Sequence, residues 1–314
     1  MSSLTTVLIG LVSIVLLGGL AAGASVLAHR HRPIVDGMHA LRDDRARNPV
    51  VRPLRAGCGS MEIGVWLDAE GRLQVGSDRR NRDAGNAVGP LVLRDLALRA
   101  AAYGGRVRPG QAKSFMLMID ILETEPTAQA RAYQALDRAL RAYPGLFTRV
   151  VDGALGLGPV TVVLIGSGSP RHTVAAHQDR RVVCDGSFGD VGAWGIPVEL
   201  VPIVSEHWSW RFGWEGVDDV PLQERVLLRQ LVDAAHDDGR QVRIFGIPER
   251  PAKVREAYWR EISAAGVDVI STARPRRLAR FLSDATTVAR PTSVAPRARD
   301  AVEPEVRVHL GSAR

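Results

Sequence analysis

From residue 35 onward, the chain alternates short runs of β-branched and apolar residues with longer amphipathic stretches. This alternation is typical of a parallel sheet, because parallel strands must be joined by crossover connections that are usually helices. Repeated over about 250 residues, it predicts a (β/α)₈ TIM-type barrel, with a doubly wound open sheet as the alternative. The candidate strands are Met61 to Leu67, Leu73 to Gly76, Phe115 to Ile121, Val160 to Ile165, Val182 to Cys184, Val198 to Val204, Val242 to Ile247 and Val267 to Ile270.

Three of the intervening stretches show helical periodicity most clearly: Pro126 to Ala142, Pro221 to Asp238 and Pro251 to Ala265. In the first, small and apolar residues recur three or four positions apart, which places them on one face of a helix. A proline marks the start of each stretch, where its missing N–H is tolerated. Glycines follow the far ends, where a residue free to adopt positive φ is useful. They are Gly145, Gly239 and Gly266.

The segment from Leu4 to Ala28 contains 25 residues and no charge. A helix needs about 20 such residues to cross a bilayer, so residues 1–34 are predicted to form an N-terminal hydrophobic helix that anchors the chain in a membrane. The small residues Ala22 to Ala24 would also fit cleavage after Ala24 and export, but MSSLTT lacks the basic residues of a signal peptide. A single-pass anchor is therefore preferred. The arginines after it favour a cytoplasmic domain, and the side of the membrane is left open.

Charge and cysteine content exclude several classes of protein. The net charge of +7 comes from 41 Lys+Arg against 34 Asp+Glu, and residues 29–55 hold seven Arg against three Asp. Lys113 and Lys253 are the only lysines, so arginine-rich codon usage explains the balance better than nucleic-acid binding, which we do not expect.

Cys58 and Cys184 could pair, but we prefer buried thiols, and neither has metal-ligand spacing. Residues 35–283 form the predicted domain, and residues 284–314, with three prolines, a flexible tail.

In a barrel of this kind, the working residues lie at the carboxyl ends of the strands and in the loops that follow. Glu62 interrupts the apolar run MEIGVWL, and a carboxylate there costs desolvation energy unless an arginine or a metal ion pairs with it. The irregular aromatic patch in SEHWSWRFGW either covers the barrel mouth or packs in the core. The full set of strand-end candidates is His39, Glu62, Asp78, Asp120, Asp185, Glu206, His207 and Glu249, of which Asp78 and Asp185 lie near glycines and would also suit turns.

Several motifs carry a resemblance to a known family. The stretch HALRDDRARNPVVRPLRAGCGSMEIGVWLDAEGRLQVGSD, residues 39–78, resembles H-x-H-N-D-Y, then P-L-x-D-A-L-x-x-G-x-x-S-x-E-A-D-V-W-L, then L-L-V-G-H-D. Further matches are FMLMIDILE, VVCDG, PIVSEHWSWRFGWEG, GRQVRIFGIPE and AGVDVISTA, which follow in order through residue 273. The chain thus resembles bacterial proteins similar to altered inheritance of mitochondria protein 6, within the superfamily of glycerophosphodiester phosphodiesterases and phosphatidylinositol-specific phospholipases C.

The resemblance implies a distorted α/β barrel that hydrolyses phosphodiesters with two histidines and a divalent cation, Ca²⁺ or Mg²⁺, held by carboxylates. The substrate class would be glycerophosphodiesters or phospholipid head groups. The first histidine matches His39, the carboxylate ligands match Glu62 and Asp120, and the Asp of H-N-D-Y matches Asp43.

Other positions depart from the family pattern. Gly64 replaces an aspartate of the metal site, so a divalent cation would bind weakly if at all. Ser77 replaces the second histidine, which removes a proton donor that is worth roughly 10²- to 10⁴-fold in rate. The other departures are Leu41, Arg42, Asp44, Leu122, Glu206, His207 and Ala273.

Three hypotheses follow. The first is a weakened hydrolase with His39 as base, Glu62, Asp120 and Asp43 as ligands, and Arg42 and His207 as replacement groups at the phosphate. The second is a membrane-tethered protein without catalytic activity that binds a phosphorylated ligand or a protein partner. The third is a structural module that associates through its aromatic patch.

Overall fold

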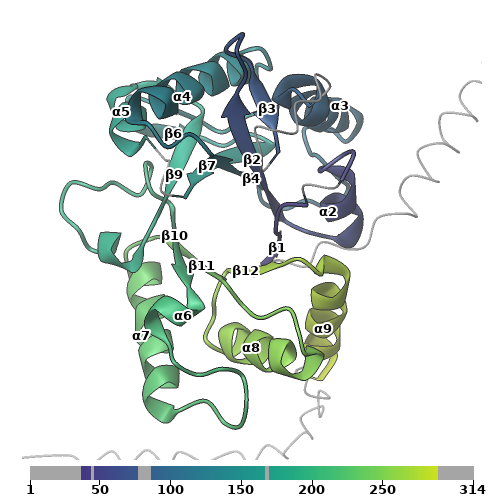
Figure 1. Cartoon of the computed structure of the whole chain (residues 1–314), viewed down its shortest axis with the longest axis vertical. Helices are drawn as coiled ribbons and strands as arrows, with labels where there is room; N and C mark the ends of the chain where they lie inside the picture. The colour runs from purple at the N-terminus through teal and green to yellow at the C-terminus, as the bar shows by residue number, and fades with distance from the viewer. Residues whose placement is uncertain (1–36, 44–45, 77–85, 167–169, 289–314) are drawn as a thin grey trace, which may run out of the picture.

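The computed structural model describes residues 37–43, 46–76, 86–166 and 170–288, and the predicted N-terminal anchor and most of the predicted tail lie outside these ranges. Within them, nine strands form one sheet in the order β1-β12-β11-β10-β9-β7-β4-β2-β3 (Figure 1). β1 also pairs with β2, which closes the sheet into a barrel. Every pairing among these strands is parallel except that of β3, which forms an antiparallel hairpin with β2, so the barrel itself has eight parallel strands. The predicted barrel is therefore confirmed.

The barrel strands are β1 (Met38–Ala40), β2 (Ser60–Leu67), β4 (Phe115–Ile121), β7 (Val160–Ile165), β9 (Val182–Gly186), β10 (Ile203–His207), β11 (Gln241–Phe245) and β12 (Val269–Thr272), with β3 (Leu73–Val75) at the rim. The helices are α2 (Val51–Ala56), α3 (Arg94–Ala102), α4 (Pro126–Arg141), α5 (Arg171–Ala176), α6 (Trp208–Arg211), α7 (Leu222–Asp237), α8 (Ala252–Ala264) and α9 (Pro275–Val288), with a π-helical turn at Gly89–Leu93 and a 3₁₀ turn at Phe188–Asp190. The larger helices lie around the outside of the strands (Figure 1).

Two hydrophobic clusters follow from the alternation of side chains along each strand. The larger cluster lies between the strands and the helices, where residues such as Ile63, Leu117 and Val162 contact the helical layer. The smaller cluster fills part of the barrel interior and contains residues at the alternate positions of the barrel strands, together with Val150 from outside those strands. The strand residues are Met118, Val163, Ile165, Val183, Ile203 and Val269. The strands are thus apolar on their outer face and on part of their inner face.

Most predicted elements match the structure closely, and the differences have local causes. The strand predicted at Val198 to Val204 forms at Ile203–His207 instead, because the amide N–H groups of Leu200 and Val201 bond to the Pro197 carbonyl in a turn. A small antiparallel sheet of β5 (Arg149–Val151), β6 (Ala154–Gly156) and β8 (Asp179–Arg180) was not predicted. α9 ends at Val288, beyond the predicted domain boundary at residue 283.

Gly145, Gly239 and Gly266 adopt positive φ of 77°, 75° and 84°, as predicted. Cys58 and Cys184 are both buried, and they do not form a disulfide bond with each other. No helix in the described part of the chain is long and apolar enough to cross a membrane.

Candidate functional site

A buried ion-pair network occupies the barrel interior toward the carboxyl ends of the strands. Its centre is Arg243 of β11, which donates from Nη2 to Glu62 Oε2 of β2 at 2.7 Å and from Nε to Ser271 Oγ of β12 at 3.0 Å. The Arg243 side chain is only 4% exposed, and its guanidinium carbon lies 4.9 Å from the centroid of the Phe245 ring. Arg243 therefore supplies a permanent positive charge at the heart of the predicted site.

His39 of β1 is fully buried within this network. Its Nε2 lies 3.3 Å from Glu62 Oε2 and its Nδ1 lies 2.9 Å from Ser60 Oγ. Both ring contacts are satisfied when Nε2–H donates to the carboxylate and the Ser60 hydroxyl, which also lies 3.4 Å from the Met38 carbonyl oxygen, donates to Nδ1. Burial and the charge of Arg243 lower the pKa of His39 to about 4, although Glu62 acts in the opposite direction. The neutral ring then has no lone pair available to a substrate at the mouth.

Glu62 has an ionised carboxylate that two partners hold. Burial alone would raise its pKa, but hydrogen bonding from His39, the charge of Arg243 and the Arg42 backbone N–H outweigh it and lower the pKa to about 2. The predicted alternatives for this residue were an arginine partner or a metal ion, and the structure contains the arginine partner.

The second carboxylate, Asp120 of β4, lies opposite Gly64 of β2 in the strand register and pairs with another arginine. Arg42 Nη1 donates to Asp120 Oδ2 at 3.3 Å. Burial raises the pKa of Asp120, and the charge of Arg42 opposes that shift. A Cβ atom at Gly64 would lie 3.1 Å from Arg42 Nη1 and 3.0 Å from Leu122 Cδ1. The loss of the side chain at position 64 thus leaves the room in which the Arg42 guanidinium lies.

These contacts leave few oxygen ligands for a divalent cation. The residues that the structure describes contain no group of three or more His, Cys, Asp or Glu side chains placed to hold a metal ion. Glu62 and Asp120 each face a guanidinium, while Gly64 and Leu122 contribute no oxygen ligand. Ca²⁺ and Mg²⁺ need several oxygen ligands, so the residues described at this position do not fit such an ion.

Asp43, predicted as a further ligand, forms an ion pair with Arg52 of α2. Arg52 also donates from Nη2 to the Ala273 carbonyl at 3.4 Å. Together with Arg42 and Glu62, these side chains line a cavity of about 170 Å³ at the mouth of the barrel. The cavity therefore presents two guanidinium groups beside the carboxyl ends of β1 and β12.

Asp185 and His207 lie on inward-facing positions of neighbouring strands. The Ser205 hydroxyl donates to Asp185 Oδ1 at 2.9 Å, and burial raises the pKa of Asp185 to about 6 against the lowering effects of Arg243 and Ser205. His207 contacts Ser209 Oγ through Nδ1 at 3.0 Å. Its ring stacks on Trp210 with centroids 5.1 Å apart. Both side chains are candidates for ligand contact at the mouth.

The remaining predicted residues have structural contacts or lie outside the described residues. Glu206 is buried and accepts a hydrogen bond from Arg211 Nε at 2.7 Å. Glu249 accepts hydrogen bonds from Thr272 Oγ1 at 3.0 Å and from the Ala273 N–H at 2.7 Å, which holds the turn between β12 and α9. Asp78 falls in residues 77–85, outside the described ranges.

The aromatic patch divides between the two roles considered for it. Trp208 and Trp214 are buried and pack against Tyr258, and the buried Phe212 packs against Trp208. Trp210, in contrast, is 74% exposed next to His207. Sequence reasoning missed Arg243, the centre of the network. The signal was present, because an ionic residue inside the apolar strand VRIF carries the same desolvation cost that singled out Glu62.

Neither a protein-family model nor a curated protein sequence matches the chain. Solved structures with a similar fold include a glycerophosphodiester phosphodiesterase from Agrobacterium tumefaciens, with 13% identity, 79% of this chain and 100% of that chain covered, and a TM-score of 0.43. A glycerophosphoryl diester phosphodiesterase from Parabacteroides distasonis has 15% identity, 82% and 88% coverage and a TM-score of 0.45. A malate synthase from Haloferax volcanii has 12% identity, 87% and 74% coverage and a TM-score of 0.46. At such low identities, the assignment to the closed parallel barrels rests on this chain's own strand pairings.

Proposed function

We propose that this barrel binds a phosphate-bearing ligand at its mouth without a metal ion and without hydrolysing it. The observation that carries the proposal is that guanidinium groups pair with both carboxylates at the predicted metal positions, Glu62 with Arg243 and Asp120 with Arg42. His39, the predicted base, is fully buried and has both ring nitrogens engaged. These contacts support a site that neither activates water through His39 nor depends on a bound cation.

The mouth cavity has the chemistry of a small anion site. A guanidinium presents five N–H donors in a planar fork that matches phosphate oxygens, and Arg42 and Arg52 both line this cavity. Their carboxylate partners do not hold them tightly, because the Arg42 and Arg52 side chains are 36% and 51% exposed and ion pairs of this kind contribute about 0–1 kcal/mol. A doubly charged phosphate can therefore compete with Asp43 and Asp120 for the same donors.

The cavity volume of about 170 Å³ is below the roughly 300–1,000 Å³ of pockets that enclose a whole ligand. We therefore assign it to a single phosphoryl group whose alcohol part remains outside.

Binding can be tested by calorimetric titration of the full chain with sn-glycerol 3-phosphate and with glycerophosphocholine in the presence of EDTA. We expect binding that chelation does not affect. Arg42→Gln and Arg52→Gln should each weaken binding about 10-fold or more, because a hydrogen bond to a charged group contributes roughly 1.5–3 kcal/mol. Arg229→Gln, on an exposed position of α7, is the matched control. Binding that requires Ca²⁺ or Mg²⁺, or that is equal in all variants, would contradict the proposal.

A second candidate is the weakened phosphodiesterase that the family resemblance implies. Asp185, whose pKa burial raises to about 6, lies on an inward-facing position and is the group that would exchange a proton with a substrate, and the His207 side chain lies on the neighbouring strand. Hydrolysis of glycerophosphocholine by the full chain, lost in Asp185→Asn or His207→Gln, would favour this candidate over pure binding. Equal background release by the unmodified chain and both variants would favour the binding role.

A further inference from the structure

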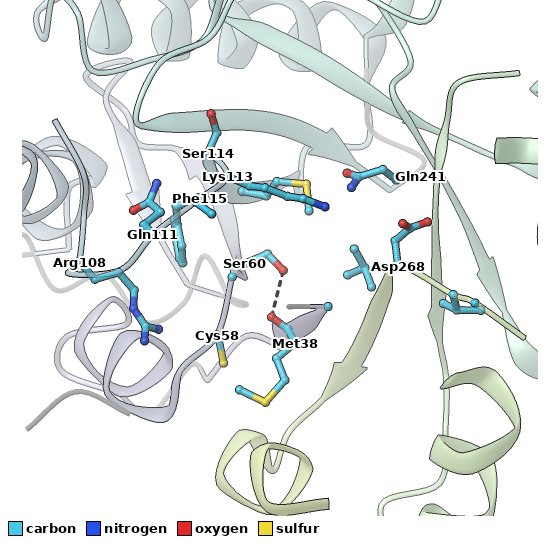
Figure 2. A pocket seen from close by; sticks show the side chains of 17 residues that line it. Met38, Cys58, Ser60, Arg108, Gln111, Lys113, Ser114, Phe115, Gln241 and Asp268 are labelled. Atoms are coloured by element: carbon cyan, nitrogen blue, oxygen red, sulfur yellow. Dashed lines mark hydrogen bonds between the residues drawn. The ribbon is translucent and has the colours of Figure 1, made fainter. Parts of the chain in front are cut away.

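Two adjoining cavities lie at the opposite end of the barrel, at the amino ends of the strands, which we call the floor. One has a volume of about 290 Å³ and is drawn in Figure 2; the other has a volume of about 570 Å³. The two cavities share the segment Gln111–Ser114, Met116 and Gln241 as lining residues, so they form one hollow region. This region is separate from the mouth cavity, whose lining includes none of these residues.

The inner wall of the larger cavity is apolar. Met116, Val163, Val183 and Ile203 line it, and all four belong to or pack against the hydrophobic cluster inside the barrel. Polar side chains, among them Thr148, Thr161, Glu199 and Gln241, line other parts of the cavity, but this wall of four residues offers no polar side chain to a sugar or a nucleotide. It matches an alkyl chain instead, because burial of methylene groups against apolar side chains is favourable.

The rim of the same cavity combines exposed apolar and basic side chains. Leu155 and Leu157, at the β6 hairpin, are 48% and 77% exposed. Arg106 and Lys113 are exposed lining residues on the opposite connection. Figure 2, which draws the smaller cavity, shows that Lys113 extends toward Gln241 and Asp268. Exposed leucines beside cations are the surface chemistry that suits the interface of an anionic bilayer.

The position of Gly37, the first described residue, agrees with a floor that faces a bilayer. Gly37 lines the smaller floor cavity, and its carbonyl accepts a hydrogen bond from the Ile270 N–H at 2.7 Å. The uncharged segment 4–28 is joined to Gly37 through residues 29–36, and eight residues reach at most about 29 Å. A bilayer that holds the uncharged segment is therefore within reach of the floor, while the mouth lies at the far end of the barrel.

We propose that the floor of the barrel docks on a bilayer and takes one acyl chain of an anionic lipid into the larger cavity, with the head group at Arg106 and Lys113. The volume of about 570 Å³ falls within the range of pockets that enclose a ligand. The floor is the end of the barrel away from the proposed phosphate site, so lipid binding there does not depend on phosphate binding at the mouth.

The test uses the full chain reconstituted in phosphatidylcholine vesicles that contain phosphatidylglycerol with a diazirine at the end of one acyl chain. After illumination, mass spectrometry locates the cross-linked residues. We expect labels at Met116 and Val163, inside the cavity, in addition to labels within residues 4–28. Labels confined to residues 4–28 would overturn the proposal. So would cross-links between floor residues of two chains, which would indicate a second copy in place of lipid.

Two variants test whether the labels depend on the larger cavity and on its rim. Val163→Trp fills the cavity and should remove the floor labels, although it also changes a buried residue. The rim variant Leu157→Asp/Lys113→Glu changes exposed residues only and should reduce floor labelling about 10-fold, while labelling of residues 4–28 persists as the internal control. Leu98→Asp/Lys253→Glu is the matched control, because Leu98 is 61% exposed and Lys253 is the other lysine of the chain. Equal floor labelling in both double variants, or equal labelling by a phosphatidylcholine probe, would contradict the assigned rim.

Discussion

The two ends of the barrel differ in how their interior space is used. At the mouth, His39, Glu62 and Arg243 satisfy one another through hydrogen bonds and ion pairs. At the floor, apolar side chains such as Val163 and Ile203 border a cavity of about 570 Å³. In α/β barrels, the mouth is the usual place of chemistry and the floor that of stability. In this chain, charged groups at the mouth stabilise one another, and the larger hollow lies at the floor.

The largest expected effect is on the mouth side of this comparison. Arg243→Met removes the partner of a buried carboxylate and should lower the free energy of unfolding by about 3–5 kcal/mol, because Glu62 is then left charged in the interior. Denaturant titration followed by circular dichroism measures the change. The double variant Glu62→Gln/Arg243→Met should recover most of the loss. Equal instability of the single and double variants would show that packing, and not charge, is responsible.

The next effect concerns the dependence of stability on pH. His39 has a pKa of about 4 in the folded chain against 6.5 ordinarily, so between these values the unfolded chain binds more protons and stability rises with pH. Asp185 has a pKa of about 6 against 3.8, so stability falls with pH over nearly the same window. Each contribution is about 3 kcal/mol, at about 1.4 kcal/mol for each pH unit between the two values.

These two contributions oppose each other, so each single variant should expose the other group. We expect His39→Gln to lose stability as pH rises from 4 to 6, and Asp185→Asn to gain stability over the same range. Denaturant titrations at several pH values measure both slopes. Identical slopes in the two variants would contradict the assigned direction of at least one pKa.

A smaller effect is expected at Gly64, where a carboxylate restored to the predicted metal position would meet Arg42. Gly64→Asp places its Cβ 3.0 Å from the Gly76 carbonyl oxygen and from Leu122 Cδ1, so the tight fit should cost about 1–3 kcal/mol. Attraction to Arg42 should make Gly64→Asp less destabilising than a comparable neutral change, Gly64→Asn. A melting temperature of Gly64→Asp that rises when Ca²⁺ is added would contradict the conclusion that guanidinium groups occupy this region.

The smallest effect is expected at the floor rim. Leu157→Ser changes a side chain that is 77% exposed and should alter the free energy of unfolding by no more than about 0.5 kcal/mol. The same denaturant titration measures it. A loss well above that value would show that the β6 hairpin supports the fold, and would weaken the assignment of the rim to docking.

The fold was largely accessible from the sequence because the strands are short β-branched runs between helices with clear periodicity. β1 was not predicted as a strand because Met38–Ala40 contains no β-branched residue, and its place depends on parallel pairing with β2 and β12. The strand predicted at Val198 to Val204 begins too early compared with β10, because the sequence alone does not show that the residues from Pro197 to Pro202 form a turn.

The site was accessible only in part. Glu62 was recognisable because ionic residues are costly inside an apolar strand, and its partner Arg243 lies 181 positions away, so only the closed barrel brings the two together. The pairing of Asp43 with Arg52 depends on the placement of α2 beside the mouth. The Arg42 side chain fits beside Gly64 because glycine has no side chain, and a comparison of motifs does not reveal this fit.

Because Arg243 carries the positive charge at this mouth, that charge does not depend on which ions are present around the protein. A coordinated cation has an occupancy that follows its free concentration, its competitors and any chelator that is present. A guanidinium is attached through its own side chain and keeps its proton at every physiological pH, so its occupancy is always complete. The positive charge beside Glu62 is therefore inherited with the polypeptide, and neither scarcity nor excess of a metal in the cell changes it.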